Sequence, residues 1–342
     1  MDGNRNQNNK YSDHYIDLAC ERVGGRAIDC SDQWFAECAN LVKPGRGVFK
    51  EGYFVDTGQW MDGWESRRSH NRNWRNSGED YDWCVVRLGI PGVIYGFDID
   101  TNHFRGNAPE VISVEAANVT TDVDENTQWT EILAQSSVQP HSQNLFDCEN
   151  QNAWTHVRLK IYPDGGVARF RVYGKAWARS ENYVSGELVD LASVINGGRG
   201  IDASDMFFSS PSNLIMPNRG ENMGDGWETK RRRDNGNDWS IIKLGLTGTI
   251  RKVVVDTAHF KGNYPDQFSL QAANANGPDA DLEWQTIINK TTLYGDREHL
   301  FIKQICCSET DEFTHVRLNI YPDGGISRLR IFGFPNWELV EK

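Results

Sequence analysis

The chain has 342 residues, which at roughly 150 residues per domain predicts two domains, each large enough to bury its own core. Its 36 basic and 48 acidic side chains leave a formal net charge of −12, so its field repels phosphate backbones and anionic lipids, and nucleic acid and membrane surfaces are not expected as partners. Gly (32) far outnumbers Pro (11), which is typical of a folded chain with many tight turns.

The chain begins with a polar stretch. Residues 1–15 are interpreted as a tail, and their opening letters MDGNRNQNNK lack the apolar segment of a secretory signal. We therefore expect a cytoplasmic protein.

Blocks of sequence from the first half of the chain return in the second half. GGRAIDCSDQWFAECANLVKPGRG from Gly24 returns as GGRGIDASDMFFSSPSNLIMPNRG from Gly197, and THVRLKIYPDGGVARFRVYG from Thr155 matches the segment from Thr314 at 14 of 20 positions. Such self-similarity indicates an internal duplication. We place the first repeat at 16–175, a linker at 176–185, the second repeat at 186–335 and a C-terminal tail at 336–342.

The first copy is longer than the second. The extra residues fall in VFKEGYFVDTGQW from Val48 and SHNRNWRNSGE from Ser69. Insertions of this kind are tolerated where loop closure costs little, so we expect both stretches to be surface loops.

The seven cysteines do not follow the duplication. Cys30, Cys38 and Cys84 face Ala203, Pro211 and Ser240 in the second copy, and no C-x-x-C spacing occurs. A disulfide or metal framework built into the repeat is therefore not expected, and the cysteines are interpreted as reduced, mostly buried thiols.

Alternating apolar residues predict strands. In residues 155–161, Val157, Leu159 and Ile161 alternate with polar residues, and the alternation resumes at 168–172 after Pro-Asp-Gly-Gly, which predicts a hairpin. Further short strands are predicted at 84–88, 97–99 and 111–115. The expected fold class is all-β, with two tandem jelly-roll β-sandwich domains.

Two matching loops carry the strongest chemical signal. DGWESRR from Asp62 and DGWETKR from Asp225 each place two carboxylates, an aromatic ring and adjacent cations in a few residues, a mixture that can bind an anion and move a proton. The alternative is a salt-bridged hairpin end with the tryptophan in the core. The candidate catalytic residues here are Asp62, Glu65, Asp225 and Glu228, and the candidate substrate-binding residues are Trp64, Arg67, Arg68, Trp227, Lys230 and Arg231.

A second pair of loops, HFRGN from His103 and HFKGN from His259, follows predicted strands. Histidine carries protons near neutral pH, so both histidines are candidate catalytic residues, although each could instead hold the fold through a backbone hydrogen bond. The remaining candidate substrate-binding residues are Asn107, Asn263, Arg169 and Arg328, of which the arginines could equally form the charged side of a half-exposed sheet.

Metalloprotease, serine-hydrolase and nucleotide-binding motifs are absent from the sequence. No metal-ligand cluster stands out, so no cofactor is expected, while a divalent metal stays open.

Together, the duplicated motifs DGWE[ST][RK]R, DT-x-HF-[RK]-GN and THVRL-x-IYPDGG-x-x-R resemble the allantoicase family, over nearly the whole chain after the tail. The resemblance implies two jelly-roll domains, a homo-oligomer with a hexamer as the candidate assembly, and hydrolysis of allantoate to ureidoglycolate and urea in allantoin degradation for nitrogen utilisation.

Allantoate carries one carboxylate and two ureido groups on one carbon. Its site needs cations for the carboxylate and an acid that protonates the departing urea. Glu65 or Glu228 would be that acid, a carboxylate or His103 or His259 would activate water, and arginine or lysine would hold the carboxylate. Which group is acid and which is base, and whether the repeats share one site, stay open.

A non-catalytic pair of carbohydrate-binding jelly rolls is the alternative function. Trp-rich sandwiches often stack on sugars, but these loops mix more acids and bases than a stacking surface needs. Urea release from allantoate, compared with retention on glycans, distinguishes the two functions.

Overall fold

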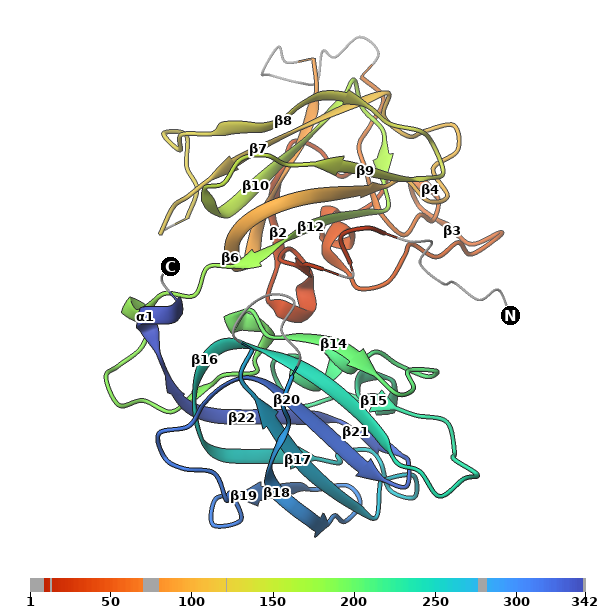
Figure 1. The fold of residues 1–342 in the computed structure, drawn as a ribbon. Helices are drawn as coiled ribbons and strands as arrows, with labels where there is room; N and C mark the ends of the chain where they lie inside the picture. Colours follow the sequence, from red (N-terminus) through yellow and green to blue (C-terminus); the bar gives the residue numbers. More distant parts are fainter. Residues whose placement is uncertain (1–8, 13, 70–79, 121, 276–281, 341–342) are drawn as a thin grey trace. The chain divides into compact units, whose positions relative to one another are not determined.

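A computed structural model describes residues 9–12, 14–69, 80–120, 122–275 and 282–340. The chain divides into two units, residues 1–177 and 178–342, coloured red to yellow-green and green to blue in Figure 1. The tail, repeat and linker boundaries given above stay predictions.

The elements of the first unit are short except for the strands of its main sheet. In chain order they are β1 (Ile16–Asp17), the 3₁₀ helix η1 (Glu21–Val23), β2 (Arg26–Cys30), η2 (Cys38–Val42), β3 (Phe54–Val55), β4 (Gly58–Gln59), β5 (Trp64–Glu65), β6 (Asp82–Asp100), β7 (Val111–Ala117), β8 (Thr130–Ser137), β9 (Gln143–Asp147), β10 (Ala153–Tyr162), β11 (Gly166–Val167) and β12 (Arg169–Ala176).

Strand β6 organises the first unit, with the sheet order β1-β12-β6-β10-β7-β8. Its first part pairs with β2 and β10, whereas its second part pairs with β12 and β9, so this long strand belongs to both layers of a β-sandwich (Figure 1). The prediction of two short strands at 84–88 and 97–99 is wrong, because the glycines and Pro91 between them do not end the strand. Gly92 pairs with Trp154, and Arg87 pairs with His156. The two partners on β10 are only two residues apart, so the additional residues of β6 between Arg87 and Gly92 form a bulge.

The predicted hairpin of residues 155–172 is also wrong. Strands β10 and β12 lie on opposite sides of β6 and do not pair with each other. Alternation reports which side chains share a face, but it does not report which strand is the partner. The segment between them instead forms β11, which pairs with β5, so it helps to build the loop that carries Glu65.

The predicted alternation on β10 is confirmed, since Val157, Leu159 and Ile161 are fully buried. Burying each such side chain contributes about 1.5–3 kcal/mol to stability. On β12 both faces are covered, because Arg169 and Arg171 are also buried. The half-exposed sheet considered for Arg169 is therefore not observed.

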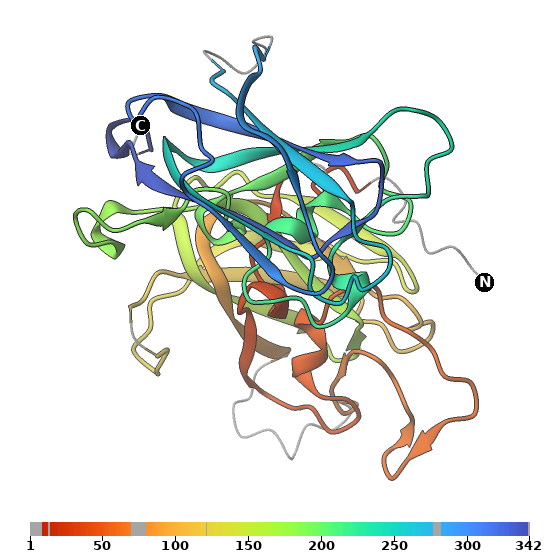
Figure 2. The same cartoon turned by 90° about the horizontal axis from the view of Figure 1, so that it is seen from below.

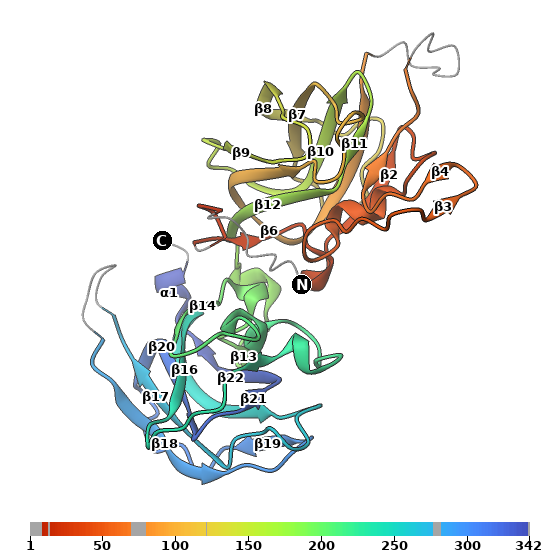
Figure 3. The ribbon, with the colours of Figure 1, turned by 90° about the vertical axis from the view of Figure 1, so that its right-hand side faces the viewer.

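The second unit repeats this topology, with the sheet order β13-β22-β16-β20-β17-β18 and β16 as its long strand, which confirms the duplicated all-β fold (Figure 3). Its elements are η3 (Ser180–Asn182), β13 (Val189–Asp190), η4 (Val194–Asn196), β14 (Arg199–Ala203), η5 (Pro211–Ile215), η6 (Met223–Asp225), β15 (Trp227–Glu228), β16 (Asp238–Asp256), β17 (Gln267–Ala273), β18 (Gln285–Thr292), β19 (Glu298–Phe301), β20 (Glu312–Tyr321), β21 (Gly325–Ile326), β22 (Arg328–Pro335) and the helix α1 (Trp337–Val340).

The first insertion forms the β3–β4 hairpin, which projects from the sheets of the first unit (Figures 2 and 3). The second insertion lies outside the described residues apart from Ser69. Within the described ranges, no helix has the length and apolar character needed to span a membrane.

Candidate functional site

In each unit, a two-residue strand holds the candidate glutamate. Glu65 ends β5, where it pairs with Gly166 of β11 on one side and forms an isolated bridge with Ala36 on the other. In the second unit, Glu228 ends β15 and pairs with Gly325 of β21. The backbone of both glutamates is therefore fixed by neighbouring segments that come from distant parts of the sequence.

The side chain of Glu65 is 8% exposed and is hydrogen-bonded to Asn107, which is one of the candidate substrate-binding residues. The Nδ2 of Asn107 donates to its Oε1 at 2.8 Å. Burial raises the pKa of the Glu65 carboxyl, and repulsion from Asp164 adds to this, while the Asn107 bond and the charge of Arg68 act in the opposite direction. A buried carboxyl with a raised pKa is suited to donating a proton near neutral pH.

The second unit repeats this pair. Asn263 Nδ2 donates to Glu228 Oε1 at 2.6 Å. Glu228 is only half-buried, and its backbone N–H donates to the hydroxyl of Ser209. The structure thus brings together the predicted residues Glu65 and Asn107, and likewise Glu228 and Asn263.

Asp62 and Arg169 form a buried ion pair. Arg169 Nη2 lies 2.8 Å from Asp62 Oδ2, and the backbone N–H of Val48 donates to the same oxygen at 2.9 Å. Burial alone would raise the pKa of Asp62, but these hydrogen bonds and the charges of Arg169 and Lys43 lower it overall. Arg328 and Asp225 form the corresponding pair at 2.9 Å. These contacts favour a structural role for all four residues over the predicted catalytic and substrate-binding roles.

Trp64 and Trp227 are both 0% exposed. Each indole N–H donates to a backbone carbonyl, that of Asp32 at 2.7 Å and that of Asp205 at 2.9 Å. A fully buried ring cannot stack on a ligand, so the two tryptophans anchor the loops to the core, as the alternative interpretation proposed.

The first cation of each loop lies over an aromatic ring, and an aspartate accepts a hydrogen bond from the backbone N–H of the same residue. Arg67 pairs with Asp32 at 2.8 Å and lies over the ring of Trp34, 5.2 Å from its centroid. In the second unit, the backbone N–H of Lys230 donates to Asp205 at 3.0 Å, and its ammonium lies 4.2 Å from the centre of the Phe207 ring. The same arrangement is thus built twice from different residues.

The second cation of each loop is exposed. Arg68 is 3.6 Å from Asp164, and 60% of its side chain is accessible. Arg231 occupies the matching position and is also exposed. An exposed guanidinium can bind the carboxylate of a ligand in a bidentate manner.

His103 and His259 begin their loops in a left-handed backbone conformation. Both have a φ of +71°, and their backbone N–H groups donate to His141 Nδ1 and Asp296 Oδ1, each at 2.8 Å. The ring of His259 is 2.7 Å from the carbonyl oxygen of Gly220. Within the described part of the chain, neither histidine is hydrogen-bonded to Glu65 or Glu228. These contacts match the alternative in which each histidine holds the backbone.

The environment of His103 lowers its pKa. Burial is the main cause and the charge of His141 adds to it, against a hydrogen bond with the backbone of Gly47. The ring stacks on Phe49 with 5.6 Å between centroids. Both effects favour the neutral form of His103, whose ring lies against the inserted stretch.

Sequence reasoning missed several residues that support the site. Asp32 and Asp205 are among them, as are the ion pairs of Arg46 with Asp100 at 2.8 Å and of Arg219 with Asp256 at 2.9 Å. All of these occur at matching positions of the two copies, so their repetition was a usable signal. Their contacts were not predictable, because each partner comes from a different segment.

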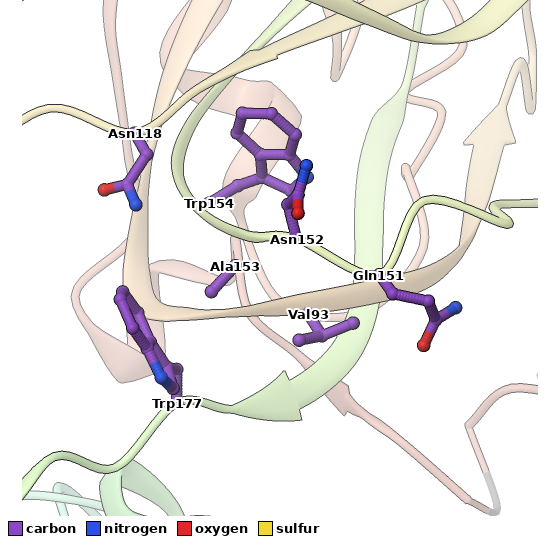
Figure 4. Close-up of a pocket in the computed structure, with 7 residues that line it drawn as sticks. All are labelled: Val93, Asn118, Gln151, Asn152, Ala153, Trp154 and Trp177. Carbon is purple, nitrogen blue, oxygen red and sulfur yellow. The ribbon is translucent and has the colours of Figure 1, made fainter.

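The first unit also contains an open cavity of about 540 Å³ near the end of β12 (Figure 4). No charged side chain is among its lining residues, which makes it a poor place for an anionic ligand. In the second unit, Asn336 and Glu312 hold the matching positions of Trp177 and Ala153 and bond to each other at 2.9 Å. The lining residues are Val93, Asn118, Gln151, Asn152, Ala153, Trp154 and Trp177.

Over the described ranges, no group of three or more histidine, cysteine or acidic side chains is arranged to hold a metal ion. The expectation that no cofactor is needed stays a prediction.

Comparisons with known proteins agree over nearly the whole chain. Residues 16–177 and 189–336 match the family model described as the allantoicase repeat. An allantoicase of Dictyostelium discoideum is 46% identical over 94% of this chain and 87% of its own length, and a probable allantoicase of Photobacterium profundum is 47% identical over 94% and 97%. The crystal structure of allantoicase from Saccharomyces cerevisiae superposes with a TM-score of 0.77 at 35% identity, covering 93% of each chain.

Proposed function

The chain belongs to the allantoicase family, and from this premise we propose that substrate binds and reacts at the loops that carry Glu65 and Glu228. The observation that carries the proposal is the glutamate–asparagine pair, which both units build at the same position.

The enzyme is a hydrolase that converts allantoate and water into ureidoglycolate and urea in purine degradation. The carbohydrate-binding alternative is not favoured, because the relatives over nearly the full length of the chain are named allantoicases. The cavity of the first unit is not the proposed site, because no lining residue could neutralise the carboxylate of allantoate.

Glu65 is the proposed acid of the first unit. Its Oε1 accepts the Asn107 bond, so the proton is placed on Oε2 and can pass to the nitrogen of the departing urea. Loss of urea leaves an acyl-iminium-like carbon and an ionised Glu65. The ionised carboxylate then takes a proton from the water that adds to this carbon, which restores the acid and completes ureidoglycolate. Glu228 has the equivalent position in the second unit.

Arg68 and Arg231 are the proposed binders of the substrate carboxylate. Both are exposed, and the positive charge of Arg68 favours the ionised form of Glu65. Arg67 and Lys230 are held against aromatic rings, so they contribute positive charge from fixed positions. His103 and His259 are assigned to positioning the loops rather than to proton transfer.

The assembly and location follow from the same premise. We propose a cytoplasmic homo-oligomer, with a hexamer as the candidate, that needs no cofactor and binds neither nucleic acid nor membranes. The exposed apolar side chains of the inserted segment support a protein contact there, since Phe54 is 67% exposed. Light scattering that shows a fully active monomer would contradict this assembly.

The test is urea release from allantoate by the purified protein at neutral pH, with and without a chelator. We expect release in both conditions, and no retention on immobilised glycans. Folded protein that releases no urea, even with added divalent metal, would contradict the placement of the reaction on this chain.

A further inference from the structure

A row of basic side chains crosses three neighbouring strands of the first unit. Arg26 of β2 pairs with Arg87 of β6, and Arg87 pairs in turn with His156 of β10. Residues directly opposite each other on antiparallel strands share one face, with Cβ atoms about 4.5–5.5 Å apart. Arg26 and Arg87 are exposed, whereas His156 is buried. The strand register therefore places two like charges side by side, next to an imidazole, and we call these three residues the first cationic row.

The second unit builds the same row from Arg199, Lys243 and His315, which we call the second cationic row. Arg199 pairs with Lys243, and Lys243 pairs with His315. In both units the hydroxyl of the preceding threonine is hydrogen-bonded to Nδ1 of the histidine, at 2.9 Å for His156 and 2.8 Å for His315. The two copies have thus kept both the charges and the attachment of the imidazole.

Strand β7 supplies no carboxylate to the first cationic row. In the next row along β10, Arg158 faces Glu115 of β7, and its Nε donates to that carboxylate at 2.9 Å. The β7 residue that faces His156 is Ala117. Over the ranges that the structure describes, neither arginine of the first cationic row forms an ion pair with a carboxylate. One row of the sheet is therefore balanced in charge and its neighbour is not.

Two aspartates lie near the first cationic row. Asp29 of β2 faces Val85, which belongs to the next row along the sheet. The charge of Asp122 acts on His156, but burial and the charge of Arg87 outweigh it and lower the pKa of this histidine. The positive charge of Arg87 is thus still felt by its neighbour in the row.

The unbalanced pair points to an anionic ligand. Two cations at directly opposite positions of a sheet repel each other and destabilise it, yet both units keep them. An anion between the two cations removes this repulsion. Arginine binds phosphate oxygens in a bidentate manner, and two positive charges match a dianion better than the single charge of a carboxylate. The net charge of −12 does not prevent such binding, because salt screens charges beyond about 8 Å under physiological conditions.

We propose that each cationic row is a binding site for a phosphate-type oxyanion. Its oxygens accept hydrogen bonds from the two cations, and Nε2 is the imidazole nitrogen left for the ligand, because the threonine hydroxyl holds Nδ1. The first site is separate from the loop of Glu65. His156 lies near the start of β10, whereas β11, which pairs with the strand of Glu65, follows the end of β10. The proposal therefore goes beyond the proposed function and does not depend on it.

Isothermal titration calorimetry of the full chain with inorganic phosphate, at constant ionic strength, tests the proposal. We expect saturable binding at one site in each unit. Arg87→Gln and Lys243→Gln should each weaken one site about 10- to 100-fold, since hydrogen bonds between charged groups are the strong ones. Arg179→Gln is the control, because this arginine lies outside both rows and pairs with Glu181, so it should leave both sites intact.

Three results of the titration would overturn the proposal. These are the absence of saturable binding, unchanged binding in the Arg87→Gln and Lys243→Gln double variant, and loss of binding in Arg68→Ala combined with Arg231→Ala. The last result would place the phosphate at the loops of the two glutamates.

Thermal unfolding gives a second readout. In phosphate-free buffer Arg87→Gln should raise Tm by about 1–3 °C, because it removes the repulsion from Arg26. Phosphate at about ten times its Kd should raise the Tm of the wild type by about 3–6 °C, and that of Arg87→Gln by less. A lower Tm of Arg87→Gln in phosphate-free buffer would contradict the unbalanced pair.

A comparison of ligands identifies the source of the oxyanion. Tighter binding of glycerol 3-phosphate than of inorganic phosphate would assign the sites to phosphate esters, and the reverse order would assign them to free phosphate. Acetate should not displace phosphate at equal ionic strength. Displacement by acetate at equal concentration would overturn the preference for a dianion.

Discussion

The two units keep the same contacts around the glutamate but place it in different environments. Glu65 and Glu228 both accept from an asparagine, yet Glu65 is 8% exposed while Glu228 is half-buried. After duplication, the asparagine bond to the glutamate was retained while the burial of the glutamate diverged. The comparison teaches that equivalent residues need not contribute equally to the reaction.

A second difference lies in buried charge. Asp98 of β6 is 2% exposed and accepts from Asn9 and Gln143, whereas Val254 stands at the matching position of β16. The first unit therefore carries a pH-dependent element in its sandwich at a position that is apolar in the second.

The largest expected effect is catalytic. Glu65→Gln keeps the shape of the side chain and removes its acidic proton, so in a Glu228→Gln background kcat for urea release should fall by about 10²–10⁴-fold, the usual value of general acid–base catalysis. Glu228→Gln should lower kcat by a smaller factor, because the carboxyl of Glu228 is more exposed than that of Glu65. Equal losses of kcat in the two folded variants would contradict the unequal contributions of Glu65 and Glu228. Full activity in the double variant would contradict the assignment of both glutamates as acids.

The next effect is on stability. Burial raises the pKa of Asp98 to about 7, with repulsion from Asp100 adding to it. Because the folded pKa lies above the unfolded value, the stability that Asp98 contributes is full below about pH 4 and is lost as the pH rises through about 7.

Asp98→Asn removes this titration. Chemical denaturation should show the free energy of unfolding of the wild type falling by about 4 kcal/mol relative to Asp98→Asn between about pH 4 and pH 8. A difference between the two proteins that does not change with pH would contradict the account.

Substrate binding should respond to the exposed arginines. Arg68→Ala should raise KM about 10- to 100-fold, since hydrogen bonds to charged groups contribute about 1.5–3 kcal/mol. Arg231→Ala reports the corresponding contribution of the second unit, and Arg179→Ala provides a control, because Arg179 is an arginine outside both loops in the sequence and pairs with Glu181. An unchanged KM in both loop variants would place the carboxylate elsewhere.

The smallest effect concerns the stacked cations. Trp34→Ala and Phe207→Ala should each lower the free energy of unfolding by about 0.5–1 kcal/mol, with Trp34 at the upper end because an indole attracts cations more strongly than a phenyl ring. Denaturation in guanidinium chloride measures both. A larger loss for Phe207→Ala would reverse the expected order.

The duplication made much of this architecture predictable. It singled out Glu65 and Asn107 because each recurs, and alternation identified the buried face of β10 correctly. The pairing of β11 with β5 was not predictable, because alternation does not specify strand partners, and this error hid the segment that supports Glu65. Trp64 and Arg169 were expected at the ligand, but burial and ion pairing are tertiary properties that the motif does not reveal.

The central claim, that Glu65 is the acid, is tested most directly by the pH dependence of urea release in a Glu228→Gln background. Activity should fall as the pH rises through the pKa of Glu65. Asn107→Leu should move this fall to higher pH, because the Asn107 bond lowers that pKa. The matched Asn263→Leu should leave it in place. A profile that is unmoved by Asn107→Leu, or that persists in Glu65→Gln, would contradict the claim.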